Sequence, residues 1–521
     1  LGSDQDLGLF REVVNGASIR ADADDDSLLV NVITANDTLL FNGGVGNSTI
    51  KFECGSDLVR FSELVAATRI LATATTDLGL SGANDTVTFD RVGAGSTIRA
   101  GSGADSLLFD QAVTLATIDA GVGVDRLVFQ GTSDGSINAA ISGVNSVGEF
   151  VSFGSGQVTA LFVDATISNS SIFGGSSQDS LVFSGSVLAN TVDAGAGSDT
   201  LRFNAAFAGG LSGFYGTNEL VSFGAGVTVA FDSAIGTASS ILSSTGRDSF
   251  VFRQGVGGAS IDAGAGVDTL FFLSSADAVI SGIDSLGEFV SFGGGTVSVT
   301  FETAIGAGST INFGANTALV TFDGDIGAAQ IKAGALADTL LFDGISVLGA
   351  SIGAGDGDDR FSGAITVGSG GVSFWGGAGG DRFALSGLSC AAGQTAYFWN
   401  EAGADTILFS NAVSATGGSA NVLLAISSGS SSVVSFLGSQ SLAALSTTSM
   451  FAVAGAGLGF VSLGVGTDMV TLSFGATNSS FGSNTFVLLG SQVESITTAY
   501  GVGAAGGTAV FGNAINMPTF S

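Results

Sequence analysis

The stretch AGSGADSLLFDQAVTLATIDAGVGVDRLVF, residues 100–129, holds one 20-residue unit and the start of its copy. In the strand-like run, Leu107 and Phe109 are two residues apart, so an extended chain places both side chains on one face. Short runs that end in phenylalanine recur along the chain, mostly at steps of 20 residues. These phenylalanines are Phe41, Phe61, Phe89, Phe109, Phe129, Phe153, Phe183, Phe203, Phe223, Phe252, Phe272, Phe292, Phe322 and Phe342.

A longer repeat overlies this step. Residues 149–218, 219–287 and 288–357 are successive copies that open with EFVSFG, ELVSFG and EFVSFG. A single coil of this kind cannot bury its apolar face, whereas stacked coils share a continuous core. We therefore predict an all-β fold, a right-handed parallel β-solenoid of the β-roll or β-helix type with ~20-residue coils, a ~70-residue super-repeat and an interior phenylalanine ladder. A β-sandwich is the alternative, and the constant step disfavours it.

The ends of the chain differ from its middle. Residues 1–35 carry an acidic cluster and are expected to form an N-terminal cap or assembly segment, followed by solenoid repeats over 36–410. Acidic residues become rare in 411–521. We expect this last part to form a modified solenoid or β-domain and to be a candidate secretion or assembly segment.

Composition excludes several functional classes. The 521 residues include no histidine and carry a net charge of −31, which excludes histidine-dependent catalysis and makes nucleic acid an unexpected partner. Apolar residues reach 45% and charged residues only 11%, so the chain is not expected to be disordered. Cys54 and Cys390 fit no metal-binding spacing and could form at most one disulfide. No apolar run is long enough for a transmembrane helix. Because the chain starts at Leu1 without a signal peptide, we expect a processed chain, a fragment, or export that leaves the N-terminus unchanged.

Six glycine-rich turns share one pattern and end in aspartate. They are AGSGAD (100–105), AGVGVD (120–125), AGAGSD (194–199), AGAGVD (263–268), AGDGDD (354–359) and GGAGGD (376–381). Glycine allows positive φ angles and exposes carbonyl oxygens, and aspartate adds a charged oxygen ligand. The pattern resembles the RTX (repeats-in-toxin) nonapeptide of calcium-binding parallel β-rolls, a family found in bacterial S-layer and secreted surface proteins. The resemblance covers roughly residues 80–410 and implies that the turns bind Ca²⁺.

Stacked coils would bring the aspartates together. Asp105 would lie above Asp85, and Asp125 above Asp105, about 5 Å apart, and a divalent cation would remove their repulsion. The alternative is that each aspartate only caps its turn by accepting hydrogen bonds from backbone N–H groups. Six copies in register favour calcium. The predicted calcium ligands are Asp85, Gly101, Gly103, Asp105, Gly121, Gly123, Asp125, Gly195, Gly197, Asp199, Gly264, Gly266, Asp268, Asp338, Gly355, Gly357, Asp359, Gly377, Gly379, Asp381 and Asp405.

The motif occurs once per coil, and the opposite turn lacks it. We therefore expect a single ion column, interrupted where glutamate or alanine replaces the aspartate. These interruptions are Glu149, Glu219, Glu288 and Ala318. Asp179 and Asp248 are weaker candidates because the glycines do not precede them.

These features predict a secreted, extracellular structural protein of a bacterial cell surface. It would be stabilised by Ca²⁺ and would self-assemble, laterally or end to end, into an S-layer or filament. The resemblance also implies type I secretion, with calcium as the folding trigger outside the cell. The alternative is a monomeric calcium-dependent adhesin or biofilm-matrix protein.

An enzyme is not expected. A polysaccharide-active β-helix enzyme is the least favoured interpretation, because bases are scarce and the acids fall on the repeat. Cell-surface polysaccharide is a further candidate partner. Trp375, Tyr397 and Trp399 could form a sugar-stacking platform, although burial of these side chains within the ladder is the favoured expectation.

Overall fold

The computed structural model describes the side chains of residues 84–130, 136–224, 226–399 and 405–410, with shorter described segments at 40–41, 45, 58–65, 68 and 403. It also gives the backbone of strands outside these ranges. The chain divides into two compact units, Leu1–Ala259 and Ser260–Ser521. Both consist of short parallel strands, and the described residues form no helix. Cys54, residues 1–35 and residues 411–521 lie outside the residues whose side chains are described.

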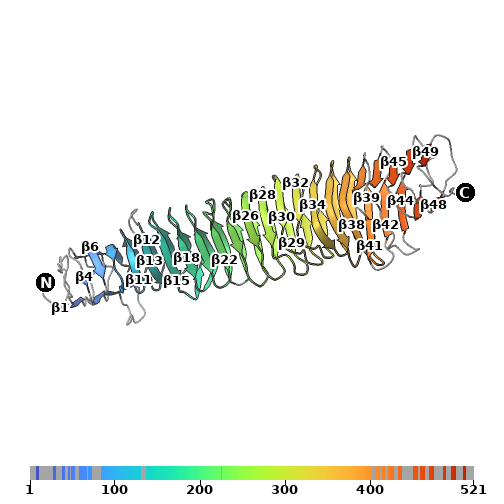
Figure 1. Ribbon diagram of the computed structural model, residues 1–521. Coiled ribbons are helices and arrows are strands. Elements are labelled where there is room, and N and C mark those ends of the chain that lie inside the picture. Colours follow the sequence, from blue (N-terminus) through green and yellow to red (C-terminus); the bar gives the residue numbers. More distant parts are fainter. Residues whose placement is uncertain are drawn as a thin grey trace. The chain divides into compact units, whose positions relative to one another are not determined.

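Successive coils pair in register. Strand β10 (Ser106–Phe109) pairs in parallel with β12 (Arg126–Phe129), and Phe109 lies opposite Phe129. Strand β11 (Val113–Asp119) pairs in parallel with β13 (Ile137–Ser142). Each coil thus contributes one strand to each of two ladders, as Figure 1 shows for the neighbouring strands within each unit. The predicted parallel β-solenoid is confirmed, with about 16 turns of ~21-residue coils.

The unit Leu1–Ala259 contains two ladders. The first consists of β3 (Thr38–Phe41), β6 (Leu58–Ala66), β8 (Thr86–Val92), β10, β12, β14 (Phe150–Phe153), β17 (Ser171–Phe173), β19 (Ser186–Asp193), β21 (Phe207–Ser212), β23 (Thr228–Phe231) and β25 (Ser249–Phe252). The second consists of β5 (Thr49–Phe52), β7 (Arg69–Ala72), β9 (Thr97–Arg99), β11, β13, β15 (Val158–Phe162), β18 (Ser180–Phe183), β20 (Thr200–Phe203), β22 (Leu220–Phe223) and β24 (Ser240–Leu242). The short strands β4 (Val45–Gly46) and β16 (Thr166–Ser168) pair with β6 and β19, whereas β1 (Leu7–Phe10) and β2 (Ser27–Val30) pair with each other in a separate two-stranded sheet.

The unit Ser260–Ser521 is built in the same way. Its first ladder consists of β27 (Thr269–Phe272), β29 (Phe289–Phe292), β31 (Thr310–Asn312), β33 (Gln330–Lys332), β35 (Ala350–Asp356), β37 (Val372–Ala378), β39 (Thr395–Asn400), β42 (Asn421–Ile426), β44 (Met450–Gly455), β46 (Met469–Ser473) and β48 (Ser495–Ala499). Its second ladder consists of β28 (Ala276–Ser281), β30 (Val297–Phe301), β32 (Ala318–Phe322), β34 (Thr339–Val347), β36 (Arg360–Val367), β38 (Arg382–Ala391), β40 (Thr406–Phe409), β43 (Ser432–Phe436), β45 (Leu458–Leu463), β47 (Thr485–Leu488) and β49 (Thr508–Phe511). Strand β41 (Val413–Thr416) also pairs with β38.

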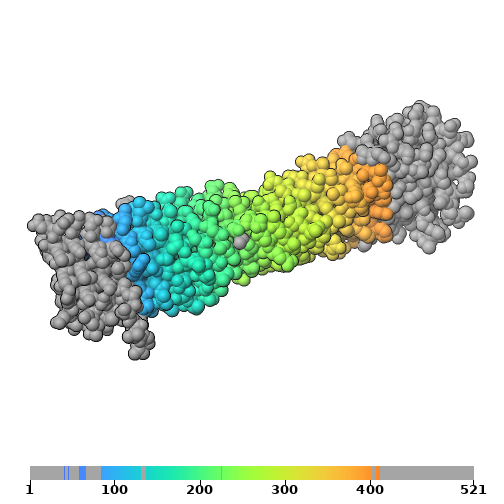
Figure 2. All heavy atoms as spheres, turned by 90° about the horizontal axis from the view of Figure 1, so that it is seen from below, coloured from blue at the N-terminus to red at the C-terminus, as the bar shows by residue number. Residues whose placement is uncertain are grey.

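The phenylalanine rings stack along the core, as predicted. On the first ladder of Leu1–Ala259, rings from Phe41 to Phe153 stack with neighbouring centroids 4.5–5.2 Å apart. The stack then moves to the second ladder, where rings from Phe162 to Phe223 lie 4.7–5.4 Å apart. The strand residues alternate between buried and outward-facing positions. On the face shown in Figure 2, the described side chains form a continuous surface within each unit.

The predicted phenylalanine stack is present, but it does not stay on one strand ladder. Phe153 and Phe183 are 30 residues apart, which is one and a half 20-residue coils, so the motif changes ladders at this step. In Ser260–Ser521 the same change separates Phe292 on the first ladder from Phe322 on the second. The super-repeat explains the change, because about 70 residues are three and a half coils. Each copy thus presents its motif on the ladder opposite to that of the copy before it.

Candidate functional site

The glycine-rich turns stack on one another too closely for side chains. In the turn 120–125, between β11 and β12, Gly121 has a φ of 99° and Gly123 a φ of 153°. A Cβ atom at Gly123 would lie 1.4 Å from the carbonyl oxygen of Gly103 in the previous coil. Backbone hydrogen bonds join the two turns, since Gly103 N donates to Val122 O at 2.9 Å and Val122 N donates to Gly101 O at 2.8 Å. Glycine is required here by conformation and by contact.

The aspartate that ends each turn is buried beneath it. Asp105 and Asp125 are 2% and 1% exposed, and Asp199 is fully buried. Asp85 N donates to Asp105 Oδ1 at 2.7 Å, and Asp105 N donates to Asp125 Oδ1 at 2.8 Å. The predicted stacking of Asp125 above Asp105 and of Asp105 above Asp85 is thus confirmed.

The same hydrogen bond links the other stacked pairs of aspartates. Asp179 N donates to Asp199 Oδ1 at 2.9 Å. In Ser260–Ser521 the corresponding bonds join Asp338 N to Asp359 Oδ1 (2.7 Å), Asp359 N to Asp381 Oδ1 (3.1 Å) and Asp381 N to Asp405 Oδ1 (3.1 Å). Each bond runs between neighbouring coils, so these aspartates connect coils and do not only cap their own turns.

The carboxylates of Leu1–Ala259 form two columns, which corrects the expectation of a single column. Asp105 and Asp125 precede strands of the first ladder, β10 and β12. Asp179 and Asp199 precede strands of the second ladder, β18 and β20. The cause is the half-coil step that also moves the phenylalanines.

One oxygen of the inner carboxylates lacks a hydrogen bond in several turns. Buried oxygens without a partner among the described residues include the Oδ2 atoms of Asp105, Asp125, Asp199, Asp359 and Asp381. The ion pairs of the described residues, Arg99–Asp119 at 3.8 Å and Arg253–Asp232 at 2.7 Å, involve partly exposed carboxylates instead. A buried carboxylate without a positive partner is unfavourable.

Burial raises the pKa of these carboxyl groups. Desolvation raises the pKa of Asp105 to about 7, although the hydrogen bond from Asp85 N lowers it, and the neighbouring charges of Asp85 and Asp125 raise it further. Desolvation is also the main cause that raises the pKa of Asp199 to about 6 and that of Asp359 to about 7. Each of these sites therefore favours a proton or another cation beside the carboxyl group.

In two turns that lack the second glycine, the aspartate accepts hydrogen bonds through both carboxylate oxygens. In GGSSQD (174–179), Asp179 accepts from Val158 N through Oδ1 at 3.0 Å and from Gly175 N through Oδ2 at 2.6 Å. In AGALAD (333–338), Asp338 accepts from Ala318 N at 2.7 Å and from Gly334 N at 3.0 Å. Here both carboxylate oxygens are bonded, as the turn-cap alternative requires. Asp248, the other weaker candidate, accepts from Val227 N at 2.8 Å and from Ser243 Oγ at 2.6 Å.

The glutamates expected to interrupt the column occupy the same buried position. Glu149, Glu219 and Glu288 are 1–2% exposed. Desolvation raises the pKa of Glu149 and of Glu288 to about 8, and that of Glu219 to about 7. The carboxyl group is retained at these coils, whereas Ala318 removes it.

A second row of acids was missed by the sequence analysis. Asp193 Oδ1 accepts from Gly195 N at 3.0 Å, and Asp262 Oδ1 accepts from Gly264 N at 3.0 Å. Asp119 holds the same place before the turn 120–125, and its charge raises the pKa of Asp125. The pattern D-A-G-x-G-x-D, present at 119–125, 193–199 and 262–268, is the signal that would have revealed these outer acids.

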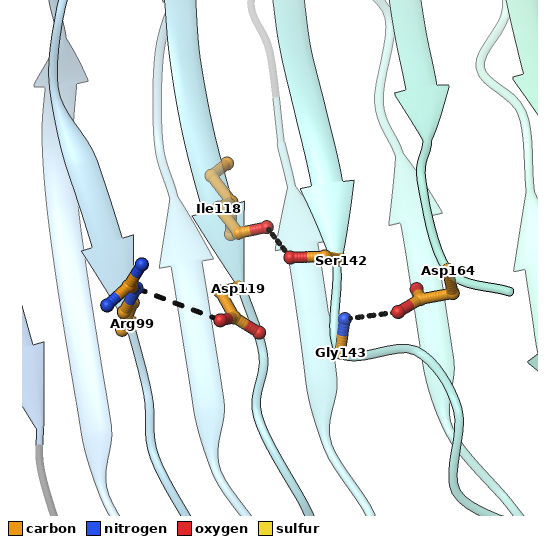
Figure 3. Close-up of polar contacts among 6 residues, drawn as sticks. All are labelled: Arg99, Ile118, Asp119, Ser142, Gly143 and Asp164. Carbon is orange, nitrogen blue, oxygen red and sulfur yellow. Dashed lines mark hydrogen bonds and ion pairs between the residues drawn. The ribbon is translucent and has the colours of Figure 1, made fainter.

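The outer row at one edge is drawn in Figure 3. Asp119 lies 3.8 Å from the Arg99 guanidinium, Ser142 Oγ donates to the Ile118 carbonyl at 3.5 Å, and Gly143 N donates to Asp164 Oδ1 at 2.8 Å. Desolvation raises the pKa of Asp164, while its hydrogen bonds lower it. Acids therefore lie both inside the coil and at its rim.

The chemistry of the donors fits calcium. Ca²⁺ binds six to eight hard oxygen ligands, and the turns offer inner carboxylates, outer carboxylates and glycine carbonyls. The buried unbonded Oδ2 atoms also fit a cation. Among the described residues no three acidic or cysteine side chains converge as a metal-binding group. Backbone carbonyl oxygens would therefore have to supply much of the coordination.

The aromatic cluster near the end of the repeats is exposed. Trp375, Tyr397 and Trp399 are 40%, 45% and 45% exposed. They lie on β37 and β39 at positions that alternate with the buried Phe374 and Phe398. The expectation that these three side chains are buried in the ladder is therefore wrong, because the alternation of the strand places them outward.

The described part of the chain contains no helix that is long and apolar enough to span a membrane. Cys390 is buried on β38, where desolvation raises the pKa of its thiol to about 12. No protein-family model matches the chain, and neither a curated protein nor a solved structure matches it significantly.

Proposed function

We propose that the protein is a secreted, calcium-stabilised structural protein of a bacterial cell surface that self-assembles into an S-layer or an extracellular filament. The observation that supports this most is the column of buried carboxylates that stack from coil to coil. Several of them, Asp105, Asp125 and Asp199 among these, leave an oxygen without a hydrogen-bond partner among the described residues. A bound cation would stabilise such a column, and the hard oxygen donors favour Ca²⁺.

The predicted glycine-rich turns would hold the ion. The inner aspartates, such as Asp105 and Asp125, would supply charged oxygens. The outer acids, such as Asp119, would add further negative charge to balance the bound Ca²⁺. Bound calcium would neutralise neighbouring carboxylates and link successive coils. Without calcium, the repulsion between Asp85, Asp105 and Asp125 would favour an unfolded, exportable chain. Type I secretion and an extracellular location are part of this proposal.

Exposed apolar side chains at the coil edge support self-assembly. Val122 and Val124 lie in the turn before β12, Val147 lies in the turn before β14, and the three side chains are 66%, 53% and 65% exposed. Such side chains are usually covered when they form a contiguous patch. Contact between copies of the chain would cover them. Burial of the inner acids also supports a structural and not a catalytic role, because a substrate would not reach them.

The test combines circular dichroism with sedimentation velocity, in EGTA and in millimolar CaCl₂. We expect calcium to induce the β-signal and large assemblies, and we expect MgCl₂ at equal ionic strength to be a poor substitute. The variant Val122→Ser/Val124→Ser should retain the calcium-induced β-signal but form fewer assemblies. A chain that is folded and monomeric in EGTA would refute the calcium-lattice proposal.

The second candidate function is a monomeric calcium-dependent adhesin or biofilm-matrix protein. The exposed aromatic side chains on β37 and β39 favour it, because such surfaces bind ligands. A chain that folds with calcium but sediments as a monomer at all concentrations would favour this candidate over the lattice protein.

A further inference from the structure

Two tryptophans stand side by side on the outer face of one ladder in Ser260–Ser521. Trp375 on β37 lies in register with Trp399 on β39. Their ring centroids are 5.2 Å apart with an interplanar angle of 25°. Rings lying flat in one plane would clash at this distance, so the two rings stack face to face along the ladder. Both side chains project outward from the sheet.

The coil that precedes β37 leaves one face of the Trp375 ring uncovered. Gly353 on β35 is the register partner of Trp375 on the side away from Trp399. A Cβ atom at Gly353 would meet only the Trp375 Cβ, at 3.8 Å, so the space above this glycine is open. Lys332 on β33 is the following register partner and is exposed. A slot therefore lies over Gly353, between Lys332 and Trp375.

The width of this slot suits one ring. Strands two positions apart on a ladder are separated by about 9.6 Å, twice the ~4.8 Å spacing of neighbouring strands. A ring that stacks about 3.5–4 Å from Trp375 fills this space and still contacts the Lys332 side chain. The slot would accept one ring and exclude two.

Polar groups without negative charge surround the slot. Ser351, Ser373 and Tyr397 form the neighbouring column of outward-facing residues. The outward-facing residues of β29, β31, β33, β35, β37 and β39 in these two columns are Phe289, Ser291, Thr310, Asn312, Gln330, Lys332, Ser351, Gly353, Ser373, Trp375, Tyr397 and Trp399. None of them is acidic, in a chain whose net charge is −31. We name these twelve residues the aromatic strip.

From this geometry we propose that the aromatic strip binds a polysaccharide of neutral sugars. One sugar ring would enter the slot over Gly353 and stack its C–H face on Trp375. Its hydroxyl groups would bond to Ser351, Ser373 and the Lys332 ammonium. Alternation of aromatic rings with hydroxyl and amide groups suits a ligand that has apolar faces and a polar rim. The acidic chain disfavours a polyanion as ligand.

This inference does not depend on the proposed calcium role, because the strip lies on a strand face and not in the turns. The two tryptophans are the only ones in the chain, so tryptophan emission reports on this strip alone. The experiment titrates the full chain, folded in CaCl₂ as checked by circular dichroism. The probes are hexasaccharides of glucose, of N-acetylglucosamine and of galacturonic acid.

We expect a neutral hexasaccharide to change the tryptophan emission saturably and to reduce quenching by acrylamide. Gly353→Leu should weaken binding at least about tenfold, because it fills the slot while both fluorophores stay in place. Trp375→Ala should weaken binding similarly, and Trp375→Phe should weaken it less. Tyr215→Ala, at an exposed tyrosine in Leu1–Ala259, is the matched control and should bind like the parent chain.

Four outcomes would overturn the proposal. The first is an unchanged emission with all neutral sugars, and the second is unaltered binding by a folded Gly353→Leu variant. The third is binding of the galacturonic acid probe alone, which would replace the neutral ligand by an acidic one. A concentration-dependent blue shift without sugar, together with dimers in sedimentation, would assign the strip to a second copy of the chain and also overturn it.

Discussion

Two neighbouring turns of Leu1–Ala259 hold a buried aspartate at the same place. The hydrogen bonds that its carboxylate accepts differ between the two turns. In GGSSQD (174–179), Gly175 N donates to Asp179 Oδ2 at 2.6 Å. In AGAGSD (194–199), Gly195 N donates instead to the outer Asp193 at 3.0 Å, and Asp199 Oδ2 has no partner among the described residues. The outer acid thus takes the N–H group that the inner acid uses in the other turn.

The difference separates two kinds of turn. Where an outer acid is present, as at Asp193 and Asp262, the turn carries two carboxyl groups around one glycine N–H. In the two turns where Phe173 or Lys332 stands at this place, the inner aspartate accepts that N–H itself. We name the first kind two-acid turns and the second self-capped turns. In the self-capped turns both oxygens of the inner aspartate are bonded, whereas Asp125 and Asp199 of the two-acid turns keep a buried Oδ2 without a partner among the described residues, so the two-acid turns are better candidates for calcium than the self-capped turns.

Chelation of calcium should have the largest effect. We expect EGTA at neutral pH to abolish most of the β-signal of the full chain, because every two-acid turn then holds unbalanced carboxylates. Hydrogen exchange should rise first at 120–125 and 194–199 and later at 174–179. Exchange that rises equally in both kinds of turn would remove the distinction between them.

Low pH should partly replace calcium. Desolvation raises the pKa of Asp105 to about 7 and of Glu149 to about 8, above the ordinary values of 3.8 and 4.5. The folded chain therefore binds more protons than the unfolded chain between these values. In EGTA, stability is then highest at about pH 4 and falls as the pH rises toward about 8, by up to about 1.4 kcal/mol per pH unit for each titrating carboxyl.

Urea unfolding at a series of pH values, in EGTA and in CaCl₂, checks this expectation. Calcium should flatten the pH dependence, because the ion replaces the proton beside the same carboxyl groups. An increase of stability with pH in EGTA would contradict it, since that is the behaviour of carboxylates whose pKa is lowered on folding.

Replacement of one turn glycine should be the next largest effect. Gly123→Ala places a Cβ atom 1.4 Å from the Gly103 carbonyl oxygen, so the two-acid turn cannot stack on its neighbour without moving. We expect a loss of about 3 kcal/mol or more in the free energy of unfolding. Gly287→Ala is the control, because its φ is 81° but no atom lies within 4 Å of the new Cβ. It should lose only about 1–2 kcal/mol.

Thermal and urea unfolding of both variants measure this difference. Equal losses would show that backbone conformation, and not the contact between turns, decides the need for glycine.

The sequence predicted the coil but not the side on which each motif lies. The 20-residue step and the positions of Leu107 and Phe109 were enough for parallel strands and stacked rings, because the period of two along a strand is strict. The change of ladder between Phe153 and Phe183 follows only when 30 residues are compared with a 20-residue coil.

The candidate site was predicted in part. The stacking of Asp125 on Asp105 follows from the register, but the hydrogen bond between Asp105 N and Asp125 Oδ1 depends on the depth of the carboxylate beneath the turn. The role of Asp193 depends on its accepting the Gly195 N–H, which Asp199 could otherwise accept. The spacing of the acids does not specify which of the two accepts it. The exposure of Trp375 was mispredicted because an aromatic side chain on a buried strand was assumed to face the core.

The smallest effect should come from aspartate-to-asparagine substitutions. Their effect on stability should differ in sign between a two-acid turn and a self-capped turn when calcium is absent. Asp199→Asn keeps the oxygen that accepts from Asp179 N and replaces the unbonded Oδ2 by a neutral NH₂ group. In EGTA at about pH 8, where the parent chain has lost most of its β-signal, this variant should keep more of that signal, because a buried charge is removed. In CaCl₂ the same variant should be less stable than the parent chain, because a charged ligand is lost. Asp179→Asn removes the acceptor of the Gly175 N–H and should lower stability by about 1–3 kcal/mol in both conditions. The β-signal of the two variants in EGTA and their urea unfolding in CaCl₂ decide the point. If Asp199→Asn responds like Asp179→Asn, both aspartates are caps, and the two-acid turns do not bind the ion.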